Sequence, residues 1–433
     1  MTTTWQNWGR SVTAHPVEVA SPRAADEVAG VIRSARERGL SVRPVGAGHS
    51  FTEIAATDGV LLDVSHIRGV LSVDAATRRV RLGAGTRLHE LPDLLDPHGL
   101  ALENMGDIDR QTIAGAISTG THGTGAGFRG LAAQVVGATL VTAAGEVLVV
   151  DETTNAELLP AVPLGLGALG VLVDVTLQCV PAFLLRAHEG SAALEDVLSH
   201  FDEYAVADHF ECYWFPGTSR VQTKTNTRVP VDVPHRRPGR VARTIDQRVV
   251  QNGLLRAVCE IGVAAPQLTP PLNRLATRAL GEKVYTDRSH AVFTSPRHVR
   301  FRESEYAVPR EALPEAVRAL RTLVERNAWR ISFPVEIRTA AADDRWLSTA
   351  HGRDSGYIAV HRYWKEDYVP YFREFDALMR EFEGRPHWGK LHFQDAESLA
   401  GVHPRFGDFA AVRDRLDPER VFTNDYLRTV LGE

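Results

Sequence analysis

The chain has 433 residues, enough for two domains, and its 44% hydrophobic and 24% charged residues are ordinary for a globular protein. A formal net charge of −5 removes the usual electrostatic motive for binding nucleic acid or an anionic membrane surface. Its three cysteines include no CxxC pair, so neither a disulfide framework nor a thiolate metal site is suggested.

Targeting and membrane segments are not expected. Residues 1–10 lack the apolar core of a signal peptide. The most apolar stretch, Leu131–Val150, is interrupted by Gln134 and Glu146, so we do not expect it to span a bilayer. These features predict a soluble, cytoplasmic protein.

The first predicted element is a helix over Ala24–Arg38, whose apolar residues recur at helical spacing and which Gly39 ends. Short β-rich segments separated by turn residues follow, with one further helix at Leu88–Leu95. This order differs from the regular alternation of a Rossmann fold and predicts an α+β domain over residues 1–180. The expected strands are 40–45, 60–64, 70–73, 80–82, 135–142, 147–150 and 171–180.

A different region begins at Pro181. Helical periods recur at 313–326 and 368–382, and strands are expected at 210–215, 331–338 and 357–363. The basic, proline-rich segment 229–238 is interpreted as a solvated loop. We expect residues 181–385 to form a second domain of sheet and covering helices, and residues 386–433 to return to the first domain.

Two loops dense in Gly, Ser and Thr are the candidate binding segments. The first is Gly46-Ala47-Gly48-His49-Ser50, and the second covers residues 118–127. Backbone N–H groups in such loops can approach a pyrophosphate closely. Either loop alone could be a plain turn, but the two together favour a nucleotide. Phe51 breaks the GxGxxG pattern and no GK[ST] follows, so neither the Rossmann nor the P-loop mode is supported.

The segment Val45–Ile54 resembles the VGxGHSF motif of the vanillyl-alcohol-oxidase flavoprotein superfamily, and most closely its sugar-1,4-lactone and alditol oxidase branch. The similarity extends in order over nearly the whole chain, except roughly residues 180–301. It implies an FAD-binding domain of that type and a cap domain with a large antiparallel sheet covered by helices. The further matching segments are 102–107, 119–125, 163–171, 336–339, His361 and 385–390.

The resemblance also implies covalent FAD. The histidine of this motif is joined to the 8α-methyl group of the flavin in relatives, which assigns that bond to His49; otherwise a loop histidine is more often a surface or capping residue. His122 is expected to pack near the cofactor without a chemical role. The residues expected to contact FAD are Gly46, Ala47, Gly48, His49, Ser50, Ser118, Thr119, Gly120, Thr121, His122, Gly123, Val171 and Lys390.

Four residues of the second region are expected on the substrate side of the flavin. Glu336 and Arg338 are two apart on a predicted strand, so their side chains leave the same face. The resemblance implies that Glu336 accepts the hydroxyl proton or holds its oxygen and that Arg338 orients the substrate; a surface ion pair is the alternative. His361 is expected to face the pocket, although it could be a core histidine. Lys390 is expected to stabilise negative charge on the reduced flavin, unless it is a solvated lysine.

Two neighbouring residues bear on the substrate and the electron acceptor. Gly106 stands where relatives carry a small residue beside the flavin, which favours access of oxygen and thus an oxidase. Asp107 replaces the serine of alditol oxidases, and this difference favours a 1,4-lactone over an open-chain polyol. Neither an HExxH motif nor a histidine cluster with ligand spacing is present, so we expect no metal.

The resemblance thus implies hydride transfer from a sugar-derived secondary alcohol, most closely an aldono-1,4-lactone, to flavin N5. Oxygen would reoxidise the flavin and yield hydrogen peroxide. The alternatives are an alditol oxidase and a lactone dehydrogenase that uses another acceptor. A non-catalytic binding protein is disfavoured because Glu336, Arg338, His361 and Lys390 occur together.

Overall fold

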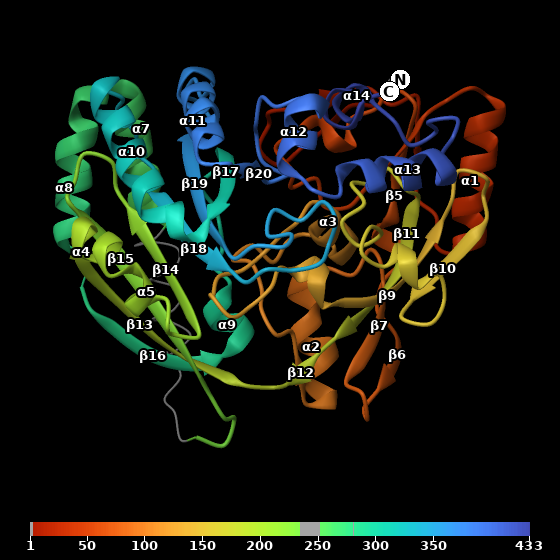
Figure 1. The fold of residues 1–433 in the computed structure, drawn as a ribbon, viewed down its shortest axis with the longest axis horizontal. Coiled ribbons are helices and arrows are strands. Elements are labelled where there is room, and N and C mark those ends of the chain that lie inside the picture. Colours follow the sequence, from red (N-terminus) through yellow and green to blue (C-terminus); the bar gives the residue numbers. More distant parts are fainter. Residues whose placement is uncertain (1–2, 234–251, 280) are drawn as a thin grey trace.

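The computed structural model describes residues 3–233, 252–279 and 281–433. The elements form two lobes that lie side by side (Figure 1). One lobe is built mainly from residues before 180 and the other mainly from residues 181–386. The expected α+β class, with a large antiparallel sheet in the second lobe, is confirmed.

The first lobe contains two sheets of three or more strands. A parallel sheet in the order β3-β5-β4 carries helix α1 (Ala25–Glu37), which confirms the first predicted helix. An antiparallel sheet has the order β10-β9-β11-β7-β6. The strands are β3 (Glu18–Ala20), β4 (Val42–Val45), β5 (Val60–Asp63), β6 (Val70–Asp74), β7 (Arg79–Gly83), β9 (Val135–Val141), β10 (Val147–Asp151) and β11 (Val171–Gln178).

Shorter elements complete this lobe. The helix expected over 88–95 is a 3-10 turn followed by α2 (Leu91–Leu95), because Pro92 begins a new helical segment. The strand expected over 171–180 is divided into β11 and the short β12. The remaining elements are α3 (Ile113–Ser118), β1 (Trp5–Gln6), β2 (Thr13–Ala14), β8 (Leu100–Ala101) and β12 (Val180–Pro181).

The second lobe is organised by an eight-stranded antiparallel sheet in the order β16-β13-β15-β14-β18-β19-β17-β20. The strand expected from Ile331 starts only at Val335, because Pro334 cannot donate to a sheet ladder. The strands are β13 (Leu184–Ala193), β14 (His209–Trp214), β15 (Arg220–Val229), β16 (Lys283–Arg288), β17 (Phe301–Pro309), β18 (Val335–Ala340), β19 (Ser355–Tyr363) and β20 (Arg385–Pro386).

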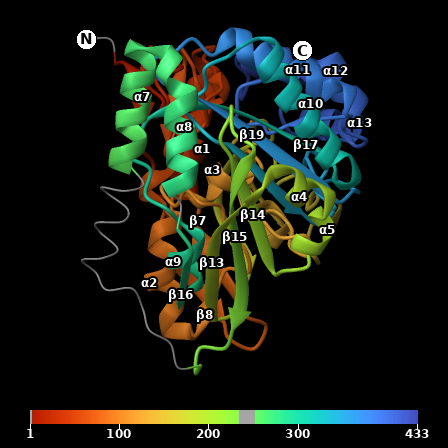
Figure 2. The same ribbon diagram turned by 90° about the vertical axis from the view of Figure 1, so that its left-hand side faces the viewer.

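Helices lie on both sides of this sheet. Figure 2 looks onto the second lobe and shows α7 and α8 on one side of strands β13–β15 and α4 and α5 on the other. The helices predicted at 313–326 and 368–382 are confirmed as α10 and α11. The bounds are α4 (Leu194–Ser199), α5 (Phe201–Tyr204), α7 (Leu255–Ala264), α8 (Thr269–Ala279), α9 (Ser289–Phe293), α10 (Leu313–Arg326) and α11 (Val369–Glu381).

Alternation along the strands gives the large sheet two unlike faces. One face is apolar: Cys212, Ile337 and Ile358 pack with α4, α5, α10 and α11 in a single hydrophobic cluster. The other face is charged and includes Glu336 and Arg338, which confirms that these two side chains leave the same side of their strand. The charged face is turned toward the first lobe, and the candidate site therefore lies between the lobes.

The C-terminal helices pack against the first lobe, as Figure 1 shows. Leu399, Phe409 and Leu427 belong to the same hydrophobic cluster as Ile54 and Leu164. These helices are α12 (Ala396–Val402), α13 (Phe406–Leu416) and α14 (Asp425–Leu431). The division into domains at residues 180 and 385 stays a prediction.

The sequence predicted a solvated loop at 229–238 and no membrane-spanning segment. Of that proline-rich loop, residues 234–238 lie outside the described residues. Within the described ranges, none of the helices combines the length and the apolar character that crossing a bilayer requires.

The apolar face of the large sheet supplies a stability prediction. Phe375 of α11 is fully buried, and its ring packs edge-on against Tyr306 at 5.5 Å between centroids. We expect Phe375→Ala to lower the free energy of unfolding by about 3–5 kcal/mol, because truncation leaves a cavity. Chemical denaturation measures the change, and Leu71→Ala, at a position 54% exposed, is the control. Equal stabilities for the two variants would contradict this account of the core.

Candidate functional site

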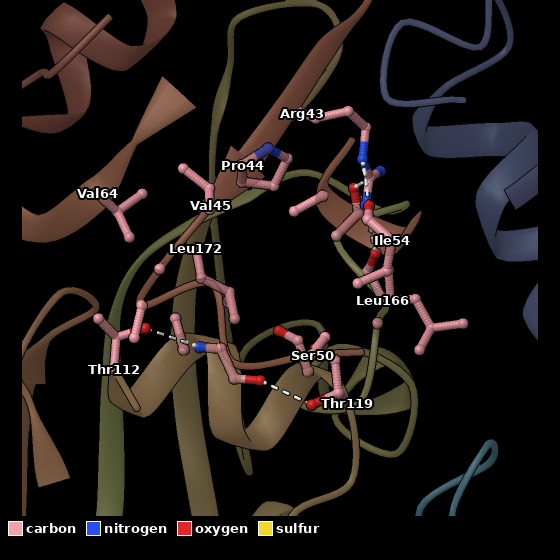
Figure 3. A pocket seen from close by; sticks show the side chains of 18 of the residues that line it. Arg43, Pro44, Val45, Ser50, Ile54, Val64, Thr112, Thr119, Leu166 and Leu172 are labelled. Carbon is pink, nitrogen blue, oxygen red and sulfur yellow. Dashed lines mark hydrogen bonds between the residues drawn. The ribbon is translucent and has the colours of Figure 1, made fainter. Parts of the chain in front are cut away.

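A cavity of about 940 Å³ lies where the two glycine-rich loops meet. Figure 3 shows side chains from several segments around it, among them Val45, Ser50, Thr119 and Leu172. The walls come from residues within 43–55, 111–119 and 162–172, together with Trp5, Val64 and Leu140. Segments distant in the sequence therefore line one pocket, which is mainly apolar and rich in glycine.

The first glycine loop is open toward this cavity. Gly46 contacts Thr112 so closely that a Cβ atom at position 46 would lie 2.1 Å from the Thr112 hydroxyl oxygen. Gly48 has a φ of +67°, which glycine adopts without strain. Among the described residues, the backbone N–H groups of Ala47 through Ser50 donate to no protein acceptor. These N–H groups are suited to an anionic ligand such as a pyrophosphate.

Residues near the N-terminus, none of which belongs to a recognisable motif, hold this loop from outside. The Trp8 N–H donates to the Gly48 carbonyl at 2.8 Å. The Asn7 amide donates to the Ser50 carbonyl at 2.9 Å, and the Ser11 hydroxyl donates to the Phe51 carbonyl at 2.7 Å. No motif signals this role, because the contacts join residues about 40 positions apart.

Arg43 crosses one end of the cavity wall (Figure 3). It is buried and its guanidinium donates to four main-chain carbonyl groups, those of residues 54, 166, 167 and 422. Burial lowers the pKa of Arg43 to about 9, which leaves it protonated at neutral pH. A single side chain thereby ties together the strand before the first loop, the 166–167 turn and the C-terminal region.

His49 lies at the junction of this cavity with a second one. Its imidazole stacks on the Trp8 ring, with centroids 5.6 Å apart. Burial, with repulsion from the charges of Arg87 and Lys390, lowers the pKa of His49 to about 4. The imidazole is therefore neutral at physiological pH, and its nitrogen lone pair is available for bonding.

The second cavity, of about 560 Å³, shares His49, Ser50, Gln111 and Thr119 with the first. Several predicted site residues meet on its wall: Gly106, Asp107, Thr121, His122, Arg338 and Lys390. The two cavities thus form adjoining compartments, one lined by glycine loops and one lined by charged side chains.

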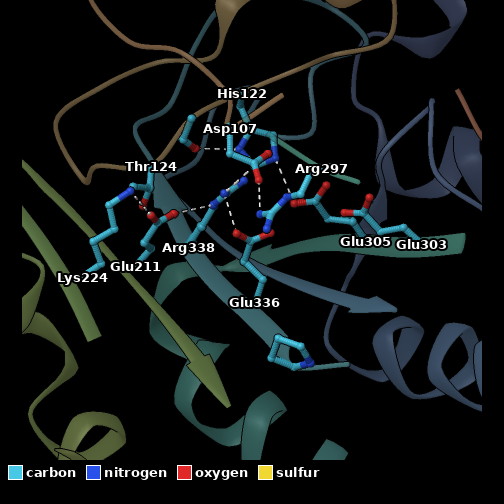
Figure 4. Close-up of polar contacts among 12 residues, drawn as sticks. Asp107, His122, Thr124, Glu211, Lys224, Arg297, Glu303, Glu305, Glu336 and Arg338 are labelled. Carbon is cyan, nitrogen blue, oxygen red and sulfur yellow. Dashed lines mark hydrogen bonds and ion pairs between the residues drawn. The ribbon is translucent and has the colours of Figure 1, made fainter. Parts of the chain in front are cut away.

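An ion-pair cluster borders the charged cavity (Figure 4). Arg338 and Asp107 line that cavity, whereas Glu336, Glu211, Lys224 and Arg297 are not among its lining residues. Arg338 lies at the centre of the cluster, 2.5 Å from a Glu336 oxygen and 3.0 Å from a Glu211 oxygen. Glu211 also pairs with Lys224 at 3.2 Å. Asp107 pairs with Arg297 and lies 3.9 Å from Arg338.

Burial and neighbouring charges shift the pKa values of the carboxylates in this cluster in different directions. Burial raises the pKa of Glu336 above its ordinary value, and the neighbouring carboxylates of Asp107 and Glu211 add to this effect. Burial alone would raise the pKa of Asp107 too, but Arg297 and Arg338 outweigh it and hold that pKa well below the usual range. Glu336 is therefore the carboxylate of this group best suited to accept a proton.

Lys390 belongs to a second charged group. Its ammonium pairs with Glu303 and lies 3.9 Å from Glu305. His361 lies 3.5 Å from Glu303, and His122 lies 3.2 Å from Glu305. His361 is buried behind Glu303 and does not line either cavity described above.

The structure does not bring every expected contact residue to a cavity wall. Val171 packs in a hydrophobic cluster, while its neighbours Gly170 and Leu172 line the first cavity. Gly120 and Gly123 shape the second loop without lining either cavity. Ser118 and Thr119 do line the first cavity.

Several charged residues of the site were not predicted. Glu211, Lys224 and Arg297 come from the segment 180–301, where no motif was identified, and Glu303 and Glu305 follow it directly. The available signal for Glu303 and Glu305 was their spacing of two residues in a strand that continues as Tyr306-Ala307-Val308, since charged residues are seldom buried without partners.

Among the residues that the structure describes, two triads could offer metal ligands: His122 with Glu305 and His387, and Glu303 with Glu336 and His361. In both cases a cation of the protein is already in contact with a carboxylate of the triad. Lys390 pairs with Glu303 and approaches Glu305, and Arg338 pairs with Glu336. We therefore assign these carboxylates to ion pairs.

The residues present fit a bound FAD. The close contact of Gly46 with Thr112 and the free N–H groups of the first loop provide a place for the pyrophosphate. His49 and Lys390 line the adjoining compartment, which would hold the flavin ring.

Comparison with known proteins gives consistent matches. The family model for D-arabinono-1,4-lactone oxidase matches residues 175–430, and that for an FAD binding domain matches residues 16–151. An L-gulono-1,4-lactone dehydrogenase of Mycobacterium tuberculosis is 44% identical over 433 residues, 100% of both chains. An L-gulonolactone oxidase of Bos taurus is 35% identical over 98% of both chains. An alditol oxidase of a Streptomyces species is 33% identical over 100% of both chains.

Among solved structures, a cholesterol oxidase from Brevibacterium sterolicum superposes with a TM-score of 0.84 at 17% identity. The match covers 100% of this chain and 97% of that one. At this identity the likeness concerns the fold alone.

Gly46 offers a direct test of the glycine-loop cavity. Gly46→Ala places a methyl group against Thr112, so we expect the loop to shift and the purified protein to retain much less FAD. The absorption of bound flavin per protein measures the loss. Gly127→Ala is the matched control, because a Cβ atom there meets nothing within 4 Å. Full flavin content in Gly46→Ala would remove this loop from the binding site.

Proposed function

Since the chain belongs to the D-arabinono-1,4-lactone oxidase family, we propose that it is an FAD-dependent oxidoreductase that oxidises a secondary alcohol of an aldono-1,4-lactone. The observation that carries the proposal is the pair of adjoining cavities, one suited to a dinucleotide and the other lined by Asp107, Arg338 and Lys390. Relatives named as lactone dehydrogenase and lactone oxidase support the substrate class.

We further propose that FAD is covalently bound through His49. Support comes from the lowered pKa of this imidazole, because a neutral nitrogen is the nucleophile that the bond requires. Stacking on Trp8 fixes the ring plane, and the Trp8 N–H to Gly48 bond holds the loop at the same point.

The charge of the second cavity favours an uncharged substrate. The cluster contains three acids, Asp107, Glu211 and Glu336, and three bases, Lys224, Arg297 and Arg338, which pair with one another. An anionic aldonate would disturb this balance, whereas a neutral lactone with several hydroxyl groups can exchange hydrogen bonds with it.

Within this site, Glu336 accepts the proton of the substrate hydroxyl, consistent with its raised pKa. Arg338 orients the hydroxyl or the lactone carbonyl, and Asp107 accepts a hydrogen bond from a second hydroxyl. Bound FAD supplies the hydride acceptor, its N5 atom. For an aldonolactone, oxidation beside the carbonyl gives a 2-keto lactone.

We propose oxygen as the electron acceptor, with hydrogen peroxide as its product. Support comes from Gly106 on the cavity wall, because a Cβ atom at this position would lie only 3.1 Å from the His122 carbonyl oxygen and from Thr121, so a larger residue would crowd this part of the wall. A dehydrogenase that uses another acceptor is the second candidate, favoured by the name of the 44% identical relative. Oxidation of alditols is a third, since an alditol oxidase is 33% identical over the whole chain.

Replacement of His49 tests the covalent bond. We expect His49→Ala to lose all flavin from the acid-precipitated protein, because no other nucleophile is assigned to the ring. Absorption spectra of pellet and supernatant measure the distribution. His89→Ala, an exposed histidine of the same lobe, should keep flavin in the pellet. Yellow precipitated His49→Ala protein would exclude this attachment site.

Anaerobic titration tests the substrate and the acceptor together. We expect an aldono-1,4-lactone to bleach the flavin of the purified holoprotein, and the corresponding aldonate and alditol to do so far more slowly. Admission of oxygen should then restore the colour and release hydrogen peroxide. Restoration by an artificial dye but not by oxygen would favour the dehydrogenase, and bleaching by alditols alone would replace the lactone as substrate.

A further inference from the structure

Two carboxylates converge on Lys390 from a single strand. Glu303 and Glu305 are two residues apart on β17, so both side chains leave its charged face. Figure 4 shows them next to each other beside the arginine cluster. Glu303 contacts the Lys390 ammonium directly, and a Glu305 oxygen lies 3.9 Å from it.

The same two residues also hold the backbone on both sides of Lys390. The Glu303 carbonyl accepts from the Leu391 N–H at 2.9 Å, and the Glu305 carbonyl accepts from the His387 N–H at 3.0 Å. Main chain and side chains of β17 therefore fix the 387–391 turn together. A lysine has a flexible stem that normally extends toward water, so this double attachment restricts where its charge lies.

Each carboxylate is supported by an imidazole on its far side. His361 of β19 lies 3.5 Å from Glu303, and its other ring nitrogen faces the Pro334 carbonyl at 3.1 Å. His122 of the second glycine loop lies 3.2 Å from Glu305, and its other nitrogen donates to the Gly123 carbonyl at 2.8 Å. The array His361–Glu303–Lys390–Glu305–His122 thus crosses from the large sheet to the first lobe.

Electrostatics keep the two acids ionised and the lysine charged. Burial alone would raise the pKa of Glu303, but Lys390 and His361 outweigh it and hold that pKa below its usual value. Burial would likewise lower the pKa of Lys390, but both carboxylates more than compensate and raise it. The ammonium is therefore a fixed positive charge on the wall of the cavity that also contains His49.

We propose that Glu303 and Glu305 are positioning residues, which act through Lys390 by holding its ammonium at the flavin face of the charged cavity. This inference rests on the proposed function, because it requires a flavin in that cavity. A preorganised positive charge there favours negative charge on the N1 and C2=O side of the ring. Without Glu303 the ammonium would turn away toward solvent and this stabilisation would be lost.

Sulfite binding tests the proposal without turnover. Sulfite binds reversibly to protein-bound flavins and bleaches them, and a positive charge near N1 strengthens the binding. In the FAD-loaded protein we expect Lys390→Met and Glu303→Gln to weaken sulfite binding by about tenfold or more. Glu305→Gln should have a smaller effect in the same direction, and Glu303→Asp, which keeps the charge, should be closer to the wild type. Lys390→Met should also slow flavin reduction by substrate more than it weakens substrate binding.

The direction of the change distinguishes positioning from simple charge screening. If Glu303 merely screened the lysine, its neutralisation would leave sulfite binding unchanged or tighter, and that result would overturn the proposal. The double variant Glu303→Gln with Lys390→Met should bind sulfite as weakly as Lys390→Met alone; a further loss would show that Glu303 does not act through Lys390. Glu260→Gln, which breaks the exposed pair with Lys365 at 2.8 Å, is the control for removal of a Glu–Lys pair.

Failure of the proposed function gives other results than failure of the positioning role. A purified wild-type protein without flavin would contradict the proposed cofactor before sulfite is added. A flavin-containing protein in which Lys390→Met weakens sulfite binding and Glu303→Gln does not would contradict the positioning role alone. Flavin content and thermal unfolding of each variant identify any that fail to fold, and Glu303→Asp and Glu305→Gln then carry the test.

Discussion

Charged side chains buried between the lobes need partners of opposite charge, and this requirement organises the molecule around its site. Each buried ion loses several kcal/mol of hydration, so an unpaired charge would be strongly destabilising. Arg338 is therefore placed between Glu336 and Glu211, and Lys390 between Glu303 and Glu305. Asp107 and His122 of the first lobe also pair with Arg297 and Glu305 of the second lobe, so the site and the packing of the lobes share contacts.

The large sheet makes this arrangement possible. Its strands alternate between an apolar face, covered by α10 and α11, and a face that carries the ions. Register places Glu336 opposite Tyr213 and Glu303 opposite His361, so charges from four strands meet without any irregularity in the sheet. Shifting any one strand by a single residue would bury its charges under the helices and expose its apolar side chains to the cavity.

The features that the sequence predicted correctly are those whose residues lie close together in the chain. The glycines at 46 and 48 and the Glu336–Arg338 spacing could be identified because each pattern lies within a few residues, and the long amphipathic helices 313–326 and 368–382 follow from period alone. Arg297 and Glu211 could not be identified, since their role arises only when segments 107, 211, 297 and 338 meet. Trp8 and Asn7 were missed for the same reason. Periodicity also did not show that Pro334 delays the start of β18, or that Val171 turns away from the cavity while its neighbours face it.

Arg43 has a consequence for how the holoprotein is made. Its guanidinium binds carbonyl groups of residues 54, 166, 167 and 422, so one wall of the glycine-loop cavity is completed by a segment synthesised long after the loop itself. A buried guanidinium whose acceptors are still missing is costly, and the strand that carries it cannot settle until they arrive. A chain that ends after the last strand of the large sheet therefore contains both glycine loops but lacks Phe422, and its cavity is not complete. The finished cavity therefore depends on the docking of the C-terminal region, although Phe422 is 379 residues from Arg43 in the sequence.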